Sequence, residues 1–163
     1  MTTIQKLNEA IQLRAENHLE DSNQLLIGLA NEYPHDAFIQ YQCAWSFDKL
    51  GKESLAVPYY EAALRGDLEE EHLQNAYLGL GSTYRALGEY VLSEKVLSEA
   101  LRLFPTNEAL KVFYALTLYN LRQHTEAMEI LVTTVAETSS DVNIDKYKAA
   151  LKFYADKLDE TWD

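Results

Sequence analysis

Apolar residues recur every three or four positions along most of the chain, and residues 77–105 show this pattern most completely. Leu80 and Tyr84 fall on one side of a 3.6-residue helix, and a second apolar stripe begins after Gly88. Glycine suits a chain reversal because it accepts positive φ without a Cβ clash. Pro105 cannot continue a helix and ends the second stripe. The pattern predicts two amphipathic helices joined by a short turn and packed as a hairpin.

The hairpin pattern occurs four times, which predicts an array of repeats. Each pair of helices buries its apolar side against its neighbours, so the array shares one continuous core. The repeats are expected at residues 3–36, 37–70, 74–107 and 108–141. A capping helix at about 143–159 is expected to cover the apolar flank of the last repeat, and residues 161–163 are expected to form a frayed tail. The predicted fold class is all-α: a right-handed α-solenoid of four hairpins plus a C-terminal capping helix, about nine helices in a single domain spanning 1–163.

The turn positions and one insertion depart from a perfect repeat. Asn17, Gly51, Gly88 and Arg122 occupy equivalent turn positions. Asparagine tolerates left-handed φ best after glycine, but arginine does not, so the last turn is expected to be strained or differently shaped. Residues 66–73 include three residues more than the repeat requires and are rich in carboxylates. We expect a solvated acidic loop there, although insertions in such arrays sometimes lie on binding faces.

The charge balance is strongly acidic, with 26 carboxylates against 14 Lys and Arg and a formal net charge of −12. Such a field repels nucleic acid phosphates and anionic lipid, and it favours either solubility alone or a basic partner. We therefore expect no nucleic-acid partner and no membrane partner. The single Cys43 excludes an internal disulfide. The first residues lack the apolar core of a signal peptide, so the expected location is cytoplasmic.

Residue patterns typical of catalysis or metal binding are absent from the sequence. The four histidines are scattered, without the i,i+4 pair of a zinc-type site. Residues 79–82, Gly-Leu-Gly-Ser, resemble part of a phosphate-binding loop, but they lack its Gly-Lys-Ser/Thr ending and lie in the middle of a predicted helix. Cys43 has no histidine at a spacing typical of a catalytic pair. We expect no catalytic residues, no metal and no cofactor.

The spacing of large and small residues resembles that of tetratricopeptide repeats, which have a large aromatic residue, Leu-Gly, Tyr, a small residue, a large residue and Pro in this order. The residues that carry this resemblance are Tyr77, Leu80, Gly81, Tyr84, Ser93, Leu97 and Pro105. Segments within 42–51, 80–88, 115–121 and 150–158 also resemble a family of small bacterial tetratricopeptide proteins of about this length. The resemblance spans nearly the whole chain. It implies a protein-interaction module of unassigned biochemical activity, with self-association as a homodimer as a further expectation.

The first helix of each stacked hairpin is expected to line the concave side of the array. Residues of those helices that are not needed for packing are expected to face a groove, where aromatic side chains and arginine serve as binding anchors. The alternative is that the aromatic residues belong to the core. The predicted groove residues are Tyr41, Trp45, Asp48, Asn75, Leu78, Ser82, Arg85, Phe113, Leu116, Tyr119 and Asn120.

This groove predicts a protein or peptide partner with an apolar or amphipathic segment. Tetratricopeptide domains that bind chaperone tails hold a C-terminal carboxylate with Lys and Asn, but the corresponding positions here are Leu7 and Ile11, or Tyr41 and Trp45 one repeat later. We therefore expect a non-enzymatic interaction scaffold. A small cytoplasmic chaperone for a secreted or aggregation-prone client is the alternative, because such chaperones have similar size and charge.

Overall fold

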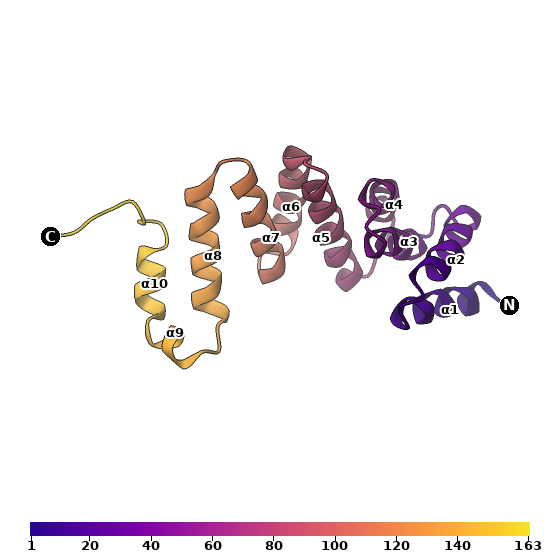
Figure 1. Cartoon of the computed structure of the whole chain (residues 1–163), viewed down its shortest axis with the longest axis horizontal. Coiled ribbons are helices and arrows are strands. Elements are labelled where there is room, and N and C mark those ends of the chain that lie inside the picture. The colour runs from indigo at the N-terminus through magenta and orange to yellow at the C-terminus, as the bar shows by residue number, and fades with distance from the viewer. The chain divides into compact units, whose positions relative to one another are not determined.

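The computed structural model describes all residues from Met1 to Asp163 and contains ten α-helices and no strand (Figure 1). The all-α prediction is confirmed. The chain divides into two compact units, Met1–Glu89 and Tyr90–Asp163. The first unit contains α1 (Thr3–Ala15), α2 (Leu19–Glu32), α3 (Ala37–Lys49), α4 (Glu53–Arg65) and α5 (Glu70–Ala86). The second contains α6 (Tyr90–Leu103), α7 (Glu108–Asn120), α8 (His124–Thr138), α9 (Val142–Lys146) and α10 (Lys148–Tyr154). None of these helices combines the length and the apolar character that crossing a membrane requires.

The turns that follow α1, α3, α5 and α7 share one backbone geometry. At their centres Asn17, Gly51, Gly88 and Arg122 have φ angles of 67°, 67°, 79° and 66°. In each turn the amide of this residue bonds to the carbonyl three positions earlier, and the next amide bonds to the carbonyl five positions before itself, at 2.8–3.1 Å. These paired bonds satisfy carbonyls that a helix end otherwise leaves open. Of the two alternatives expected for the last turn, strained or differently shaped, the structure shows the first, because Arg122 is a non-glycine residue at positive φ in a turn of the same shape as the others.

In the first unit each helix packs against the next one along the chain, and the first helices of successive hairpins, α1, α3 and α5, also contact one another in that order. Small side chains permit the close approaches: Ala10, Ala44 and Ala56 are fully buried. The Ser22 hydroxyl on α2 donates to the Ala10 carbonyl on α1 at 2.7 Å. The surface formed by α1, α3 and α5 is called the first-helix wall below.

The insertion lengthens a helix. α5 begins at Glu70 and has 17 residues, whereas α1, α3 and α7 each have 13. Leu68 is buried in the short loop before α5, and the His72 ring in its first turn lies 4.7 Å from the Phe38 ring. The prediction of a solvated loop over 66–73 is therefore wrong for its second half, because these contacts offset the entropy lost by ordering the segment.

In the second unit α6 packs against α7, α7 and α8 form a hairpin, and α10 packs against α8. Ala115, Leu118 and Ala127 form the buried centre of this hairpin. The hydroxyls of Ser93 and Thr117 share a hydrogen bond of 2.8 Å where α6 meets α7. Fully buried hydroxyls are thus satisfied by each other, as a close-packed helix pair requires.

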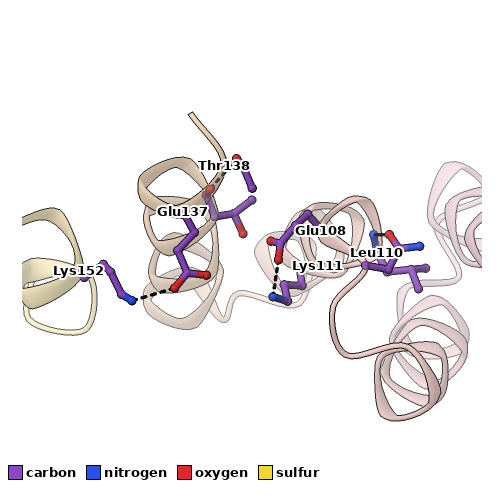
Figure 2. A network of polar contacts seen from close by, with 8 residues as sticks. Glu108, Leu110, Lys111, Glu137, Thr138 and Lys152 are labelled. Carbon is purple, nitrogen blue, oxygen red and sulfur yellow. Dashed lines mark hydrogen bonds and ion pairs between the residues drawn. The ribbon is translucent and has the colours of Figure 1, made fainter. Parts of the chain in front are cut away.

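The C-terminal cap consists of two short helices, which corrects the single helix expected over 143–159 and makes the total ten. Tyr147, with φ −105° and ψ 12°, separates α9 from α10, so the chain changes direction before α10 packs on α8. Lys152 of α10 pairs with Glu137 of α8 at 2.8 Å, while Glu108 and Lys111 pair within α7 (Figure 2). The cap is therefore joined to the last hairpin by an ion pair as well as by packing.

The Trp162 side chain contacts the cap. The Trp162 ring lies 6.0 Å from the Phe153 ring and 5.4 Å from the Tyr154 ring. Aromatic pairs at these separations attract one another. The prediction that residues 161–163 form a frayed tail is therefore wrong for Trp162.

Candidate functional site

The first-helix wall carries an aromatic cluster centred on Tyr41. Its ring centroid lies 6.1 Å from that of Trp45 at an interplanar angle of 21°, 5.7 Å from His72 and 6.5 Å from Tyr60. Tyr41 and Trp45 are four positions apart, so they occupy one face of α3. Tyr41 is 5% exposed, whereas Trp45 is 37% exposed. Tyr41 is thus a buried support, and Trp45 presents the accessible aromatic surface.

Arg14 of α1 completes this surface. Its guanidinium lies 3.9 Å from the centroid of the Trp45 ring, a cation–π distance. It also donates to Oε1 and to the backbone carbonyl of Gln42, at 2.5 and 3.4 Å. The sequence-based prediction did not include Arg14. It stands at the same repeat position as Asp48 and Arg85, one and two repeats later, and that correspondence could have identified it.

Asp48 is engaged in packing between helices. Its Oδ2 accepts a hydrogen bond from the Tyr60 hydroxyl at 2.5 Å, and its Oδ1 accepts one from the Thr83 hydroxyl at 3.0 Å. Burial raises the pKa of Asp48, and these two hydrogen bonds act in the opposite direction. Gly79 makes room for the arrangement, because a Cβ there would lie 2.5 Å from the Tyr60 hydroxyl. Gly79, the first glycine of the sequence that resembles a phosphate-binding loop, therefore serves helix packing.

The other predicted residues of the first unit lie on α5. Asn75 is exposed and forms a hydrogen bond with the Tyr41 side chain. Burial raises the pKa of Tyr41, and this hydrogen bond lowers it. Leu78, Ser82 and Arg85 are half-buried. The Ser82 hydroxyl donates to a carbonyl of its own helix at 3.0 Å. Among the predicted residues, the structure brings Tyr41 into contact with Trp45 and with Asn75.

The remaining four predicted residues lie on α7 in the second unit. Phe113, Leu116 and Asn120 are half-buried. Tyr119 is 60% exposed, and its ring meets the His124 ring edge-on at 4.7 Å. Of these four side chains, Tyr119 therefore offers the largest accessible aromatic surface.

The second unit also has two open hollows that the sequence-based prediction did not identify. One, of about 370 Å³, is lined by residues of α6, α7, α8 and the loop after α6, and these include Lys111 and Tyr114. The other, of about 270 Å³, is apolar and is lined by Met128, Val135 and Leu151 among others. No group of three or more His, Cys, Asp or Glu side chains is arranged to hold a metal ion.

The chain is similar in sequence to known repeat proteins. A family model described as "Tetratrico peptide repeat" matches residues 35–158. Superkiller protein 3 of Saccharomyces cerevisiae (strain ATCC 204508 / S288c) is 27% identical over 104 residues, which cover 60% of this chain. The match spans only 7% of the length of that protein.

Two solved structures are similar in fold. One is "MamA RS-1 ArsTM double mutant", with a TM-score of 0.74 and 15% sequence identity. The superposed region covers 95% of this chain and 85% of the chain in that structure. The other, "Crystal structure of YrrB: a TPR protein with an unusual peptide-binding site", has a TM-score of 0.65 at 17% identity and covers 93% of this chain and 87% of its own. At these identities the likeness shows the fold, an α-solenoid of helical hairpins.

Proposed function

We propose that this chain, which belongs to the tetratricopeptide repeat family, is a non-enzymatic scaffold that binds a peptide or a partner surface on its first-helix wall. Stacked helical hairpins generally present such extended binding surfaces. The observation that carries the proposal is the exposed Trp45, which is held in place by Arg14 and Tyr41. Aromatic side chains and arginine dominate protein-binding hot spots. A side chain that is already ordered loses less conformational freedom when it binds.

The state of two polar groups near the cluster, Asp48 and Cys43, favours a binding role over a catalytic one. Both carboxylate oxygens of Asp48 accept hydrogen bonds from the protein itself. Cys43 is fully buried, and burial raises the pKa of its thiol to about 12. Neither group therefore offers an accessible nucleophile or base at neutral pH.

The test is a selection of random displayed peptides on the immobilised protein, followed by measurement of Kd for an enriched peptide by fluorescence anisotropy. Trp45→Ala should weaken binding by about 2 kcal/mol or more, about thirtyfold in Kd, if Trp45 is a hot spot. The matched control is Leu55→Ala, because Leu55 is a 51% exposed apolar residue on α4 in the same unit. Circular dichroism melts of both variants establish that they remain folded.

A ligand on the first-helix wall should also change the fluorescence of Trp45. The chain has two tryptophans, so Trp162→Phe leaves Trp45 as the single reporter. The proposal fails if no peptide is enriched, if Trp45→Ala and Leu55→Ala weaken binding equally, or if a bound peptide leaves the Trp45 emission unchanged.

A further inference from the structure

Arg14 has no acidic partner, although the chain has 26 carboxylates and only 14 Lys and Arg. Its hydrogen bonds go to Gln42, and none of the ion pairs of the structure includes it. The ionisable groups that favour its charged form are the phenols of Tyr41 and Tyr60, and phenols are neutral at pH 7. The positive charge of Arg14 is therefore not compensated within the protein.

The missing partner matters because Arg14 is half-buried. Burial lowers the pKa of Arg14, which means that its surroundings disfavour the charge. A fully exposed arginine is solvated by water, whereas a partly desolvated one gains more from an opposite charge. A guanidinium has five N–H donors in a planar fork, and the contacts with Gln42 leave donors for a carboxylate.

The surface beside Arg14 is apolar. Leu7, Ile11 and Arg14 share one face of α1, since they are spaced by four and three positions, and all three are half-buried. The Arg14 guanidinium also lies over the Trp45 ring, 3.9 Å from the ring centroid. A peptide that crosses the wall at this point therefore meets apolar side chains next to the guanidinium of Arg14.

We propose that the ligand of the first-helix wall carries an Asp or Glu side chain beside an apolar residue. Its carboxylate pairs with Arg14 while the apolar side chain packs on Trp45. This inference rests on the proposed function and specifies the ligand of the same surface. The net charge of −12 acts against an acidic ligand at long range, but salt screens that field over about 8 Å, so the pairing is decided at contact.

The experiment uses random peptides displayed as internal segments, so that side-chain carboxylates are the only carboxylates offered. They are selected against the wild type, Arg14→Met and Arg65→Met. Met preserves much of the aliphatic stem of arginine without its charge, and Arg65 is an exposed arginine on α4 of the same unit. We expect Asp or Glu beside apolar residues to be enriched with the wild type and with Arg65→Met, and this acidic preference to be lost with Arg14→Met.

A selected peptide then completes a double-mutant cycle. Replacing its acidic residue with the corresponding amide should raise Kd about tenfold or more for the wild type, and about twofold or less for Arg14→Met. Arg14→Lys keeps the charge but loses the planar fork, so its effect should be intermediate. If Arg14→Met does not fold, the comparison of the wild type with Arg14→Lys decides the question.

The outcomes separate this inference from the proposed function. Peptides enriched in Lys or Arg, or an acidic preference that Arg14→Met retains, would overturn the inference and leave the binding surface in place. Wild-type binding that requires a free peptide C-terminus, measured with a matched acid and amide, would overturn it in favour of a terminal carboxylate. A selection that enriches no sequence would overturn the inference and the proposed function together.

Discussion

The turn at Arg122 provides a quantitative test of the repeat geometry. Its φ of 66° lies in the left-handed region, beside 67° at Gly51 and 79° at Gly88. An L-residue there costs about 1–2 kcal/mol relative to the right-handed region, while glycine loses about 0.5–1 kcal/mol more backbone entropy on folding. Arg122→Gly should therefore raise the free energy of unfolding by about 0.5–1 kcal/mol.

Urea denaturation monitored by circular dichroism measures this gain, and hydrogen exchange of α7 and α8 amides reports whether it is local. In a chain of this length the thermal midpoint should rise by about 1–4 °C. Arg122→Ala is the control, because it removes the charge but keeps a Cβ at positive φ, and its stability should stay close to that of the wild type. The reverse change, Gly88→Ala, should lower stability by a similar amount. If Arg122→Gly is no more stable than Arg122→Ala, strain at this turn is refuted.

Three further predictions concern the first unit. Gly79→Ala should destabilise the protein by about 1–3 kcal/mol in urea denaturation, because the added Cβ would meet the Tyr60 ring. Gly28→Ala should stabilise the protein by about 0.5–1 kcal/mol, because the space around its Cβ is open. Changes in stability of the same sign for the two variants would contradict this account. Burial raises the pKa of Asp48 above 3.8, so the wild type loses stability as the pH rises through the pKa of the folded state. Asp48→Asn should therefore have a larger free energy of unfolding than the wild type at about pH 7, and this difference should disappear towards about pH 3. Cys43 is fully buried, and burial raises the pKa of its thiol to about 12. Iodoacetamide should therefore label it no faster than the chain opens, and labelling of the native protein at the rate of an exposed thiol would be incompatible with this burial.

The predicted binding residues show where sequence periodicity stops being informative. The helical phase places Tyr41 and Trp45 on one face of α3, yet one is buried and the other exposed. The difference comes from Tyr60 on α4 and His72 on α5, which approach Tyr41 in space. The repeat position of Arg14 matches those of Asp48 and Arg85 in the sequence, but its stacking over Trp45 depends on how α1 packs against α3.

The sequence by itself determined the helices, the turns and the membership in a repeat family, because these follow from periodicity and from residues such as Gly51 and Gly88 that act within one hairpin. The tertiary structure alone decided the interruption of the cap at Tyr147, the lengthening of α5 and the pairing of Arg14 with Trp45. His72 of α5 contacts Phe38 of α3, Arg14 of α1 lies over Trp45 of α3, and Lys152 of α10 pairs with Glu137 of α8. Contacts between side chains from different helices leave no fixed spacing along the chain.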